Sequence, residues 1–172
     1  MSLSDLLEYL DGDSFIAADP DPETAPIWIG SVGYERFQHN EAFATMLAAE
    51  GVERLIDVRD LPISRKHGFA KTALTQALAE RGIEYVHAKL LGNPKEFRDL
   101  YKSGKIEAGR SRYQAFLLEE RVDALRELVS LIREKRSALM CVEHDEATCH
   151  RNVIFCALSE ELGLDVLVNR LD

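Results

Sequence analysis

The carboxyl-terminal part of the sequence places a thiol, an imidazole and a guanidinium on three successive residues. Cys149, His150 and Arg151 directly follow Thr148, and Glu143 lies a few residues upstream. Side chains of these types can bind an anion, form a covalent intermediate or transfer a proton. Residues 143–151 are therefore the first candidates for a functional site.

A helix beginning after Thr148 would place these three side chains in its first turn, because threonine is a common N-cap residue. The free backbone N–H groups and the helix dipole favour an anion there and activate a cysteine. Three interpretations follow: Arg151 binds a phosphate or another anion, Cys149 acts as a nucleophile, or the side chains only pack against neighbouring strand ends. In an enzyme, Glu143 and His150 would be the acid–base pair.

Better-defined motifs do not fit this stretch. A phosphatase loop needs a longer spacing than that from Cys149 to Arg151. A zinc site could be assembled from two cysteines and two histidines, namely Cys141, His144, Cys149 and His150. The sequence nevertheless predicts no metal, because no Cys-x-x-Cys pair is present and the spacing is not a standard one. Walker A, Gly-x-Gly-x-x-Gly and Gly-x-Ser-x-Gly motifs do not occur either.

Apolar runs alternate with helical patterns along the chain. The runs predict strands at 27–32, 54–58, 83–87, 138–142 and 164–168, and amphipathic spacing predicts helices at 38–50, 71–80, 111–136 and 148–162. Strands separated by helices indicate right-handed crossovers. The expected fold class is α/β, a single-domain three-layer Rossmann-like fold with a mostly parallel sheet of about five strands and flanking helices. The domain covers 26–172, and 1–25 form an acidic N-terminal extension.

Residues 88–110 interrupt this alternation. Glycine, proline and serine are frequent in them, and only a weak helical pattern is present. A loop of this length in a compact domain is usually functional. We expect a lid or binding loop here, with a surface insertion as the alternative.

The predicted strand ends carry a second set of candidates. In an open α/β sheet, ligands bind outside the carboxyl ends of the strands. Glycine, arginine, histidine and cysteine at these ends favour a polar, net-positive crevice. The expected anion-binding residues are Gly30, Ser31, Arg59, Arg65, His87 and Arg151, and one pocket is expected to join Arg59, His87, Glu143 and Arg151.

The charge balance is uneven along the chain. The 172 residues have a net charge of −9, and the first 25 contain seven acidic residues and no basic one. Residues 59–112 instead contain twelve basic and six acidic side chains. Because a ligand responds to the local field, the acidic total does not exclude an anionic partner.

The composition is that of a globular protein. Hydrophobic residues make up 46% and charged residues 30%, which excludes a disordered or collagen-like chain. No long uncharged apolar run occurs, and no basic residue precedes an apolar run at the N-terminus. We therefore expect neither a membrane partner nor a secretory signal. Three cysteines without an export signal favour a cytoplasmic location.

Several motifs together resemble the bacterial and archaeal family called domain of unknown function 488. The similarity spans roughly residues 27–168, and its most specific part is the Cys-His-Arg sequence at 149–151. The other matching motifs are Gly30, Asp57–Arg59, Pro62, Ser64, Phe69, Gly82–His87, Leu91-Gly92 and Leu139–Glu143. The resemblance implies an α/β fold and a shared site, but no particular reaction.

Two functions fit these observations. In the first, a small protein, with or without enzymatic activity, binds a phosphate-bearing small molecule such as a nucleotide at the strand ends. In the second, a non-catalytic module binds nucleic acid through the basic region 59–112, with aromatic stacking platforms at Phe69, Tyr85, Phe97, Tyr101 and Tyr113. The sequence indicates no particular cofactor, reaction or oligomeric state.

Overall fold

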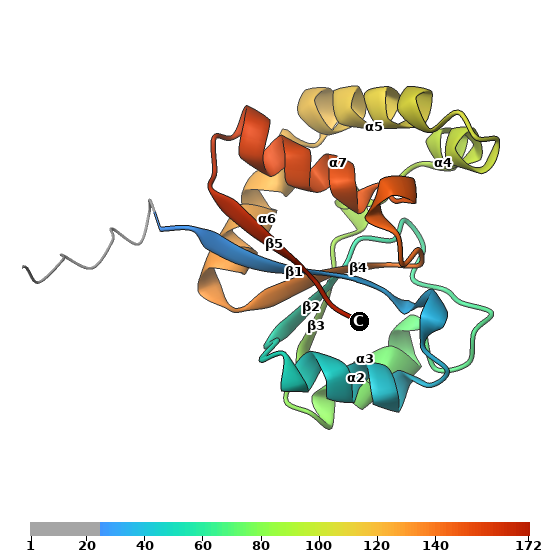
Figure 1. Ribbon diagram of the computed structural model, residues 1–172, viewed down its shortest axis with the longest axis vertical. Helices are drawn as coiled ribbons and strands as arrows, with labels where there is room; N and C mark the ends of the chain where they lie inside the picture. Colours follow the sequence, from blue (N-terminus) through green and yellow to red (C-terminus); the bar gives the residue numbers. More distant parts are fainter. Residues whose placement is uncertain (1–24) are drawn as a thin grey trace, which may run out of the picture.

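The computed structural model describes residues 25–172 (Figure 1). The acidic segment predicted at 1–25 therefore lies, apart from Ala25, outside the described residues. Five strands and six α-helices alternate along the described chain. None of these helices has the length and apolar character that a membrane span requires.

All five strands run parallel in one sheet, in the order β3-β2-β4-β1-β5. This confirms the α/β fold class. The strands are β1 (Ile27–Gly33), β2 (Arg54–Asp57), β3 (Glu84–His87), β4 (Ser137–Cys141) and β5 (Val166–Arg170). β5 begins later than predicted because the Leu164 N–H bonds the carbonyl of Leu158, which ties the expected start of the strand to the preceding helical turn.

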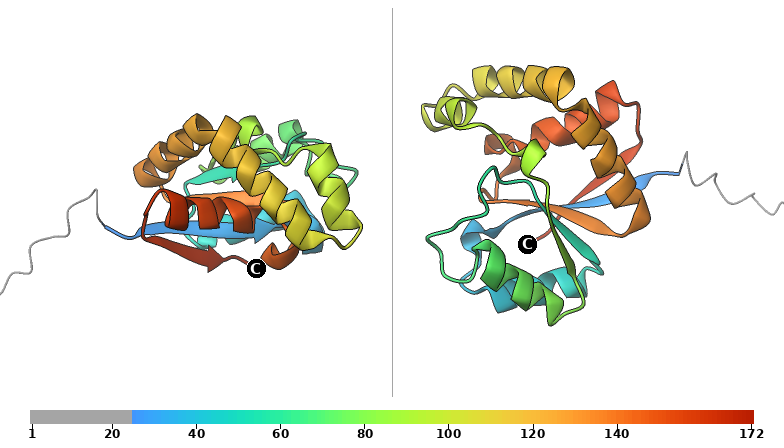
Figure 2. Two further views of the ribbon diagram at one scale, coloured as in Figure 1. Left: turned by 90° about the horizontal axis from the view of Figure 1, so that it is seen from above. Right: turned by 180° about the vertical axis from the view of Figure 1, so that it is seen from behind.

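Helices cover both faces of the sheet, which gives the predicted three layers (Figures 1 and 2). One face packs against α2 (Asn40–Ala49) and α3 (Lys71–Ala79). The other packs against α5 (Ile106–Glu120), α6 (Val122–Glu134) and α7 (Arg151–Cys156), and α4 (Lys95–Lys102) lies on α5. Successive residues of β4 alternate between the two cores, as strand geometry requires.

The prediction of a loop at 88–110 is wrong. A 3₁₀ turn (Lys89–Leu91), α4 and the beginning of α5 occupy this range. Gly109, which suggested a loop, lies inside α5, where a Cβ would come within 2.7 Å of the Tyr101 ring on α4. This glycine therefore permits two helices to approach closely, and Gly104, with φ of +76°, forms the turn between them.

The single helix predicted at 111–136 is also wrong, because α5 and α6 are separate helices (Figure 2). The chain changes direction at Arg121, whose φ of −128° and ψ of 18° are not helical. Apolar residues continue at helical spacing through the break, at Leu118, Val122 and Leu125. Periodicity alone could not reveal the bend because Leu118 of α5 and Leu125 of α6 both pack in the same core.

Gly33 ends β1 where the backbone passes against the segment that follows β4. A Cβ at this position would lie 1.9 Å from the carbonyl oxygen of Glu143. Because a backbone atom cannot rotate away, Gly33→Ala is expected to lower the free energy of unfolding by about 2 kcal/mol in urea denaturation. Gly82→Ala is the control, since it has a positive φ but nothing within 4 Å. It should cost about 1 kcal/mol or less, and an equal loss would contradict the steric argument.

Candidate functional site

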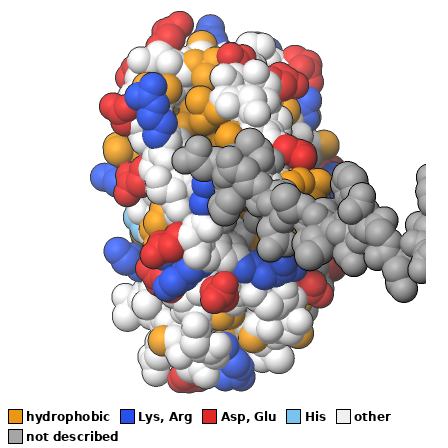
Figure 3. All heavy atoms as spheres, turned by 90° about the vertical axis from the view of Figure 1, so that its left-hand side faces the viewer, with side chains coloured by type: hydrophobic (Ala, Val, Ile, Leu, Met, Phe, Trp, Pro, Cys, Tyr) orange, Lys and Arg blue, Asp and Glu red, His pale blue; other side chains and the backbone are white. Residues whose placement is uncertain are grey.

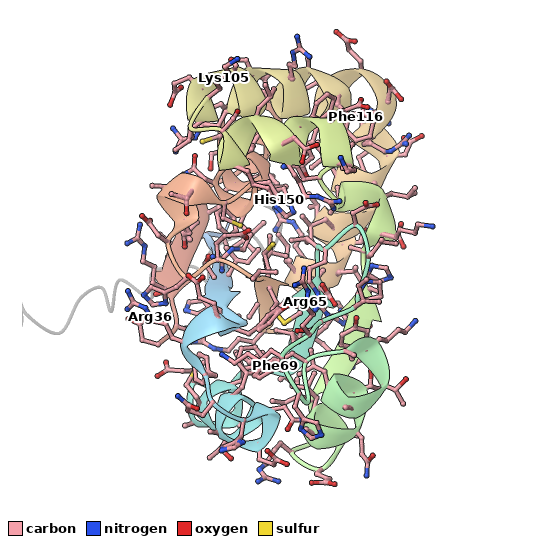
Figure 4. The ribbon with its side chains drawn as sticks, turned by 90° about the vertical axis from the view of Figure 1, so that its right-hand side faces the viewer. Arg36, Arg65, Phe69, Lys105, Phe116 and His150 are labelled. Carbon is pink, nitrogen blue, oxygen red and sulfur yellow. The ribbon has the colours of Figure 1, made fainter. Side chains whose placement is uncertain are left out.

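A cavity of about 640 Å³ opens at the carboxyl edge of the sheet. Its lining comes from the segments that follow β1, β2, β3 and β4, and from α4. Gly33 of β1 pairs with Cys141 of β4, and Asp57 of β2 pairs with Met140, so these strands end side by side. Figure 4 views this edge, with His150 near its centre and Arg65 below it. The cavity lies where the general rule for α/β sheets places a ligand site.

The buried part of the lining contains two thiols and an imidazole. Cys141 ends β4, Cys149 follows the 3₁₀ turn Glu146–Thr148, and His150 directly precedes α7. These three residues are 5%, 1% and 6% exposed. Glu143 lies half-buried beside them, with its Oε2 3.1 Å from the Cys141 sulfur.

The predicted start of the helix, directly after Thr148, is wrong. Thr148 closes the 3₁₀ turn, which is capped by the Asp145 carboxylate accepting from the N–H of Ala147 at 2.9 Å. Cys149 is extended, with φ of −120° and ψ of 148°, and α7 begins at Arg151 and contains only six residues. The helix-dipole argument for an anion at Cys149 therefore does not hold.

The His150 ring lies between the two cysteine sulfurs and the backbone of Val58. Its Nε2 lies 2.8 Å from the carbonyl oxygen of Val58. Because a carbonyl can only accept, Nε2 carries a hydrogen and donates it. The other ring nitrogen, Nδ1, lies 3.7 Å from the Cys141 sulfur and 3.8 Å from the Cys149 sulfur.

The electrostatic environment separates the two thiols. Burial opposes ionisation of Cys149, but the hydrogen bond from Cys141 and the charge of His150 together lower the pKa of the Cys149 thiol well below its usual value. The same hydrogen bond, followed by burial, raises the pKa of Cys141. For His150, burial alone would lower the pKa, but the negative charge on Cys149 raises it. Burial, then the Cys149 charge, raises the pKa of Glu143.

Arg59 forms a buried ion pair with Asp57 at the end of β2. Its Nη2 lies 2.6 Å from Asp57 Oδ2, and its Nε lies 2.8 Å from Oδ1. Its Nη1 donates to the carbonyl of Phe69 at 2.9 Å and to the Tyr34 hydroxyl at 3.3 Å. Tyr85 donates to Asp57 at 2.6 Å, and its pKa is raised chiefly by burial. The Arg59 side chain thus lines the cavity, but its nitrogens already hold the segment after β2 in place.

Arg65 is exposed on the cavity wall, where the sequence predicted an anion-binding residue. Arg151, however, is fully buried outside the lining. Its Nη2 donates to the carbonyls of Glu143 and His144, and its Nε donates to the Cys149 sulfur at 3.4 Å. Arg151 therefore joins the segment after β4 to α7.

The remaining predicted residues also lie outside the lining. His87 contacts the carbonyl of Arg59 at 2.8 Å and lines a separate cavity of about 170 Å³ beside α6. Gly30 and Ser31 are buried within β1, and a Cβ at Gly30 would come within 2.8 Å of Leu171 and Ala138. Of the four residues expected in one pocket, the cavity joins Arg59 and Glu143 but not His87 or Arg151.

Sequence reasoning missed three basic residues of the lining. Lys66 follows Arg65, and Arg98 and Lys102 project from α4. Arg98 and Lys102 are four residues apart, so on a helix they lie on the same face. This spacing indicates a basic helix face only if the segment is a helix, whereas the sequence predicts a loop there. In all, five basic and three acidic side chains line the cavity: Arg59, Arg65, Lys66, Arg98 and Lys102 against Glu35, Asp60 and Glu143. At the opposite edge, where the strands begin, charges of both signs are interspersed (Figure 3).

Metal-ligating atoms also converge at the buried end of the cavity. The sulfurs of Cys141 and Cys149 and a ring nitrogen of His150 lie within 4.8 Å of one another, the only such group of three or more in the described residues. His144, the fourth residue of the zinc set weighed in the sequence, instead lies 3.3 Å from Asp172. The fold thus brings together three of the four residues without a Cys-x-x-Cys pair.

Comparison with curated proteins and comparison with solved structures each found no match. A family model described as "Domain of unknown function DUF488" matches residues 39–158. The matched range is more than two thirds of the chain and includes the buried cluster Cys141, Glu143, Cys149 and His150. The chain belongs to the DUF488 family.

Proposed function

We propose that this protein is a small enzyme that binds a phosphate-bearing small molecule, such as a nucleotide, in the strand-end cavity. The observation that carries the proposal is that one cavity joins an exposed basic lining to a buried end rich in reactive side chains. Its volume of about 640 Å³ lies within the range of small-molecule sites. An anion held by the outer lining would meet the thiols, imidazole and carboxyl at the inner end.

Arg65 and Lys102 are the side chains best suited to attract the anion. Both are exposed on the lining. Arg65 makes no hydrogen bond or ion pair with the described part of the chain, so its guanidinium is available for a bidentate contact with phosphate. Arg98 is partly neutralised by Asp60 at 3.1 Å, and Lys66 donates to backbone carbonyls. The excess of basic groups supports an anionic ligand despite the acidic net charge.

Glu143 is the group that we assign to proton transfer. It is half-buried on the lining. Burial and the negative charge of Cys149 raise the pKa of its carboxyl group, which is the shift that a general acid needs. Cys149 and His150, the other predicted catalytic residues, lie at the same end of the cavity. Which bond is cleaved or formed depends on the ligand, so binding is the property to test first.

The nucleic-acid alternative receives less support from the aromatic residues. Phe69 and Tyr113 are fully buried, and Phe97 packs edge-on against Phe116. Tyr85 is hydrogen-bonded to Asp57, and Tyr101 packs on Gly109. Rings held in these positions offer no row of exposed platforms on which successive bases could stack.

Calorimetric titration with adenosine, AMP and ADP tests the proposal in metal-free buffer. Affinity should rise with each phosphate and fall as salt is added, because exposed charges are screened. Arg65→Ala should weaken ADP binding by about tenfold, since a charged hydrogen bond contributes about 1.5 kcal/mol. Arg126→Ala, on α6 and away from the cavity, is the matched control and should leave affinity unchanged.

Three results would contradict the proposed phosphate binding, each for a different reason. Equal affinity for adenosine and ADP would show that the basic lining does not select phosphate. Equal losses in the Arg65 and Arg126 variants would show that only overall charge matters. A single-stranded oligonucleotide that binds far more tightly than ADP would favour the nucleic-acid module.

A further inference from the structure

The two buried thiols and the imidazole at the inner end of the cavity have the geometry of a metal site. A metal bound tetrahedrally by sulfur at about 2.3 Å and nitrogen at about 2.05 Å holds these two atoms about 3.6 Å apart. The His150 Nδ1 atom lies 3.7 Å from one sulfur and 3.8 Å from the other. The three atoms therefore need to move little to share one ion.

The orientation of the imidazole supports the same conclusion. The carbonyl of Val58 fixes the hydrogen of neutral His150 on Nε2, which leaves the lone pair on Nδ1. That lone pair is directed at the side where both sulfurs lie. Histidines that bind metals through one nitrogen commonly donate the other N–H to a carbonyl or carboxylate in this way.

The surroundings of the cluster fit a bound cation with negatively charged ligands. The Nε of Arg151 donates to the Cys149 sulfur at 3.4 Å, and a donor of this kind stabilises a thiolate. Cys141, Cys149 and His150 all line the cavity, so a fourth coordination position would face it. Three protein ligands and one open position are the arrangement of catalytic rather than structural zinc sites.

We propose that Cys141, Cys149 and His150 bind one thiophilic divalent ion, Zn²⁺, through two sulfurs and Nδ1, with the fourth position open to the cavity. Thiolate and imidazole ligands select zinc over magnesium or calcium, which prefer oxygen. With the ion bound, His150 would be a ligand and its Nδ1 would not be free to accept a proton. The metal site stands on the cluster geometry and does not depend on the proposed nucleotide binding.

Cobalt titration of the metal-free, reduced full-length protein tests the site. Co²⁺ should bind with one ion per chain and give the thiolate-to-cobalt charge-transfer band and visible bands of a tetrahedral site, and Zn²⁺ should abolish them. Cys149→Ser and Cys141→Ser should each weaken binding roughly a hundredfold or more, because loss of a ligand exceeds the 10- to 100-fold cost of losing a group behind one. Cys156→Ser is the matched control and should bind like the wild type, since Cys156 lies outside the cluster.

X-ray absorption of the zinc-loaded wild type keeps the test independent of whether the variants fold. It should show two sulfur neighbours at about 2.3 Å and nitrogen or oxygen neighbours at about 2.0–2.1 Å. Absence of the charge-transfer band in the wild type, wild-type cobalt affinity and band intensity in both Cys141→Ser and Cys149→Ser, or a shell without sulfur would overturn the proposal. Nucleotide binding is measured on the metal-free protein, and metal binding is measured without nucleotide. Either proposal can therefore be contradicted without affecting the other.

Discussion

Replacement of Asp57 by alanine is expected to lower the free energy of unfolding by about 3–5 kcal/mol, because it leaves the charge of Arg59 buried without its counterion. Asp57 is fully buried and Arg59 is 5% exposed, so water cannot take over the lost contacts. The carboxylate binds the guanidinium through both oxygens, at 2.6 and 2.8 Å, and it also accepts from Tyr85. Urea denaturation of the single variant measures the loss.

Two further variants separate the buried charge from other causes. Asp57→Ala/Arg59→Met removes both charges and keeps an unbranched apolar side chain, so it should be more stable than Asp57→Ala alone. Tyr85→Phe removes only one hydrogen bond and should cost about 1 kcal/mol. If the double variant is less stable than Asp57→Ala, the ion pair is not what makes Asp57 important.

The same ion pair connects stability to ligand binding. Arg59 fastens the segment after β2 through the carbonyl of Phe69, and this segment carries Arg65 and Lys66. Arg59→Met should therefore weaken ADP binding indirectly, by releasing the wall on which Arg65 stands. Arg59 lies on the cavity lining, but its strand-end position in the sequence could not show that a neighbouring carboxylate already occupies its nitrogens.

The fold could be predicted from the sequence because each strand is a short apolar run and each connection contains a helical pattern. β1 and β4 are buried along nearly their whole length and are mostly apolar, which is the pattern of a parallel sheet, whereas β2 places the apolar pair Leu55-Ile56 between two buried charged residues, Arg54 and Asp57. Glycines had two opposite roles that spacing cannot separate: Gly104 forms a turn, whereas Gly109 lies inside α5. This ambiguity is the physical reason why the glycines of residues 88–110 wrongly predict a loop.

The candidate site was only partly predictable. Strand ends indicated its location, and Glu143, Cys149 and His150 do meet there. The spacing of Cys141 from Cys149 matches no zinc motif, because β4 and the 3₁₀ turn at 146–148, rather than a tight loop, bring the two sulfurs together. A ligand set assembled from tertiary structure leaves no short-range signature in the sequence.

Replacement of Arg151 by alanine is expected to lower the free energy of unfolding by about 3 kcal/mol or more, rather than to act first on ligand affinity. The side chain is fully buried, so its removal leaves a cavity, and the carbonyls of Glu143 and His144 lose a charged donor. Arg151→Met, which keeps much of the volume without the donors, should recover part of the loss. The segment that carries Glu143 and Cys149 should lose order in both variants, so the cobalt band should weaken as well.

Arg151→Lys distinguishes this structural role from the anion-binding role that the sequence suggested. A lysine keeps the positive charge but cannot reproduce the fork of hydrogen bonds to the two carbonyls and the Cys149 sulfur. If Arg151 acts as a structural clamp, the variant should be measurably less stable, yet its folded form should bind ADP within about twofold of the wild type, because the residue lies outside the cavity lining. A tenfold loss of ADP affinity with unchanged stability would instead mean that Arg151 reaches the ligand. The cavity would then have to open in solution on the side of α7, and the basic lining at Arg65 would be only part of the anion site.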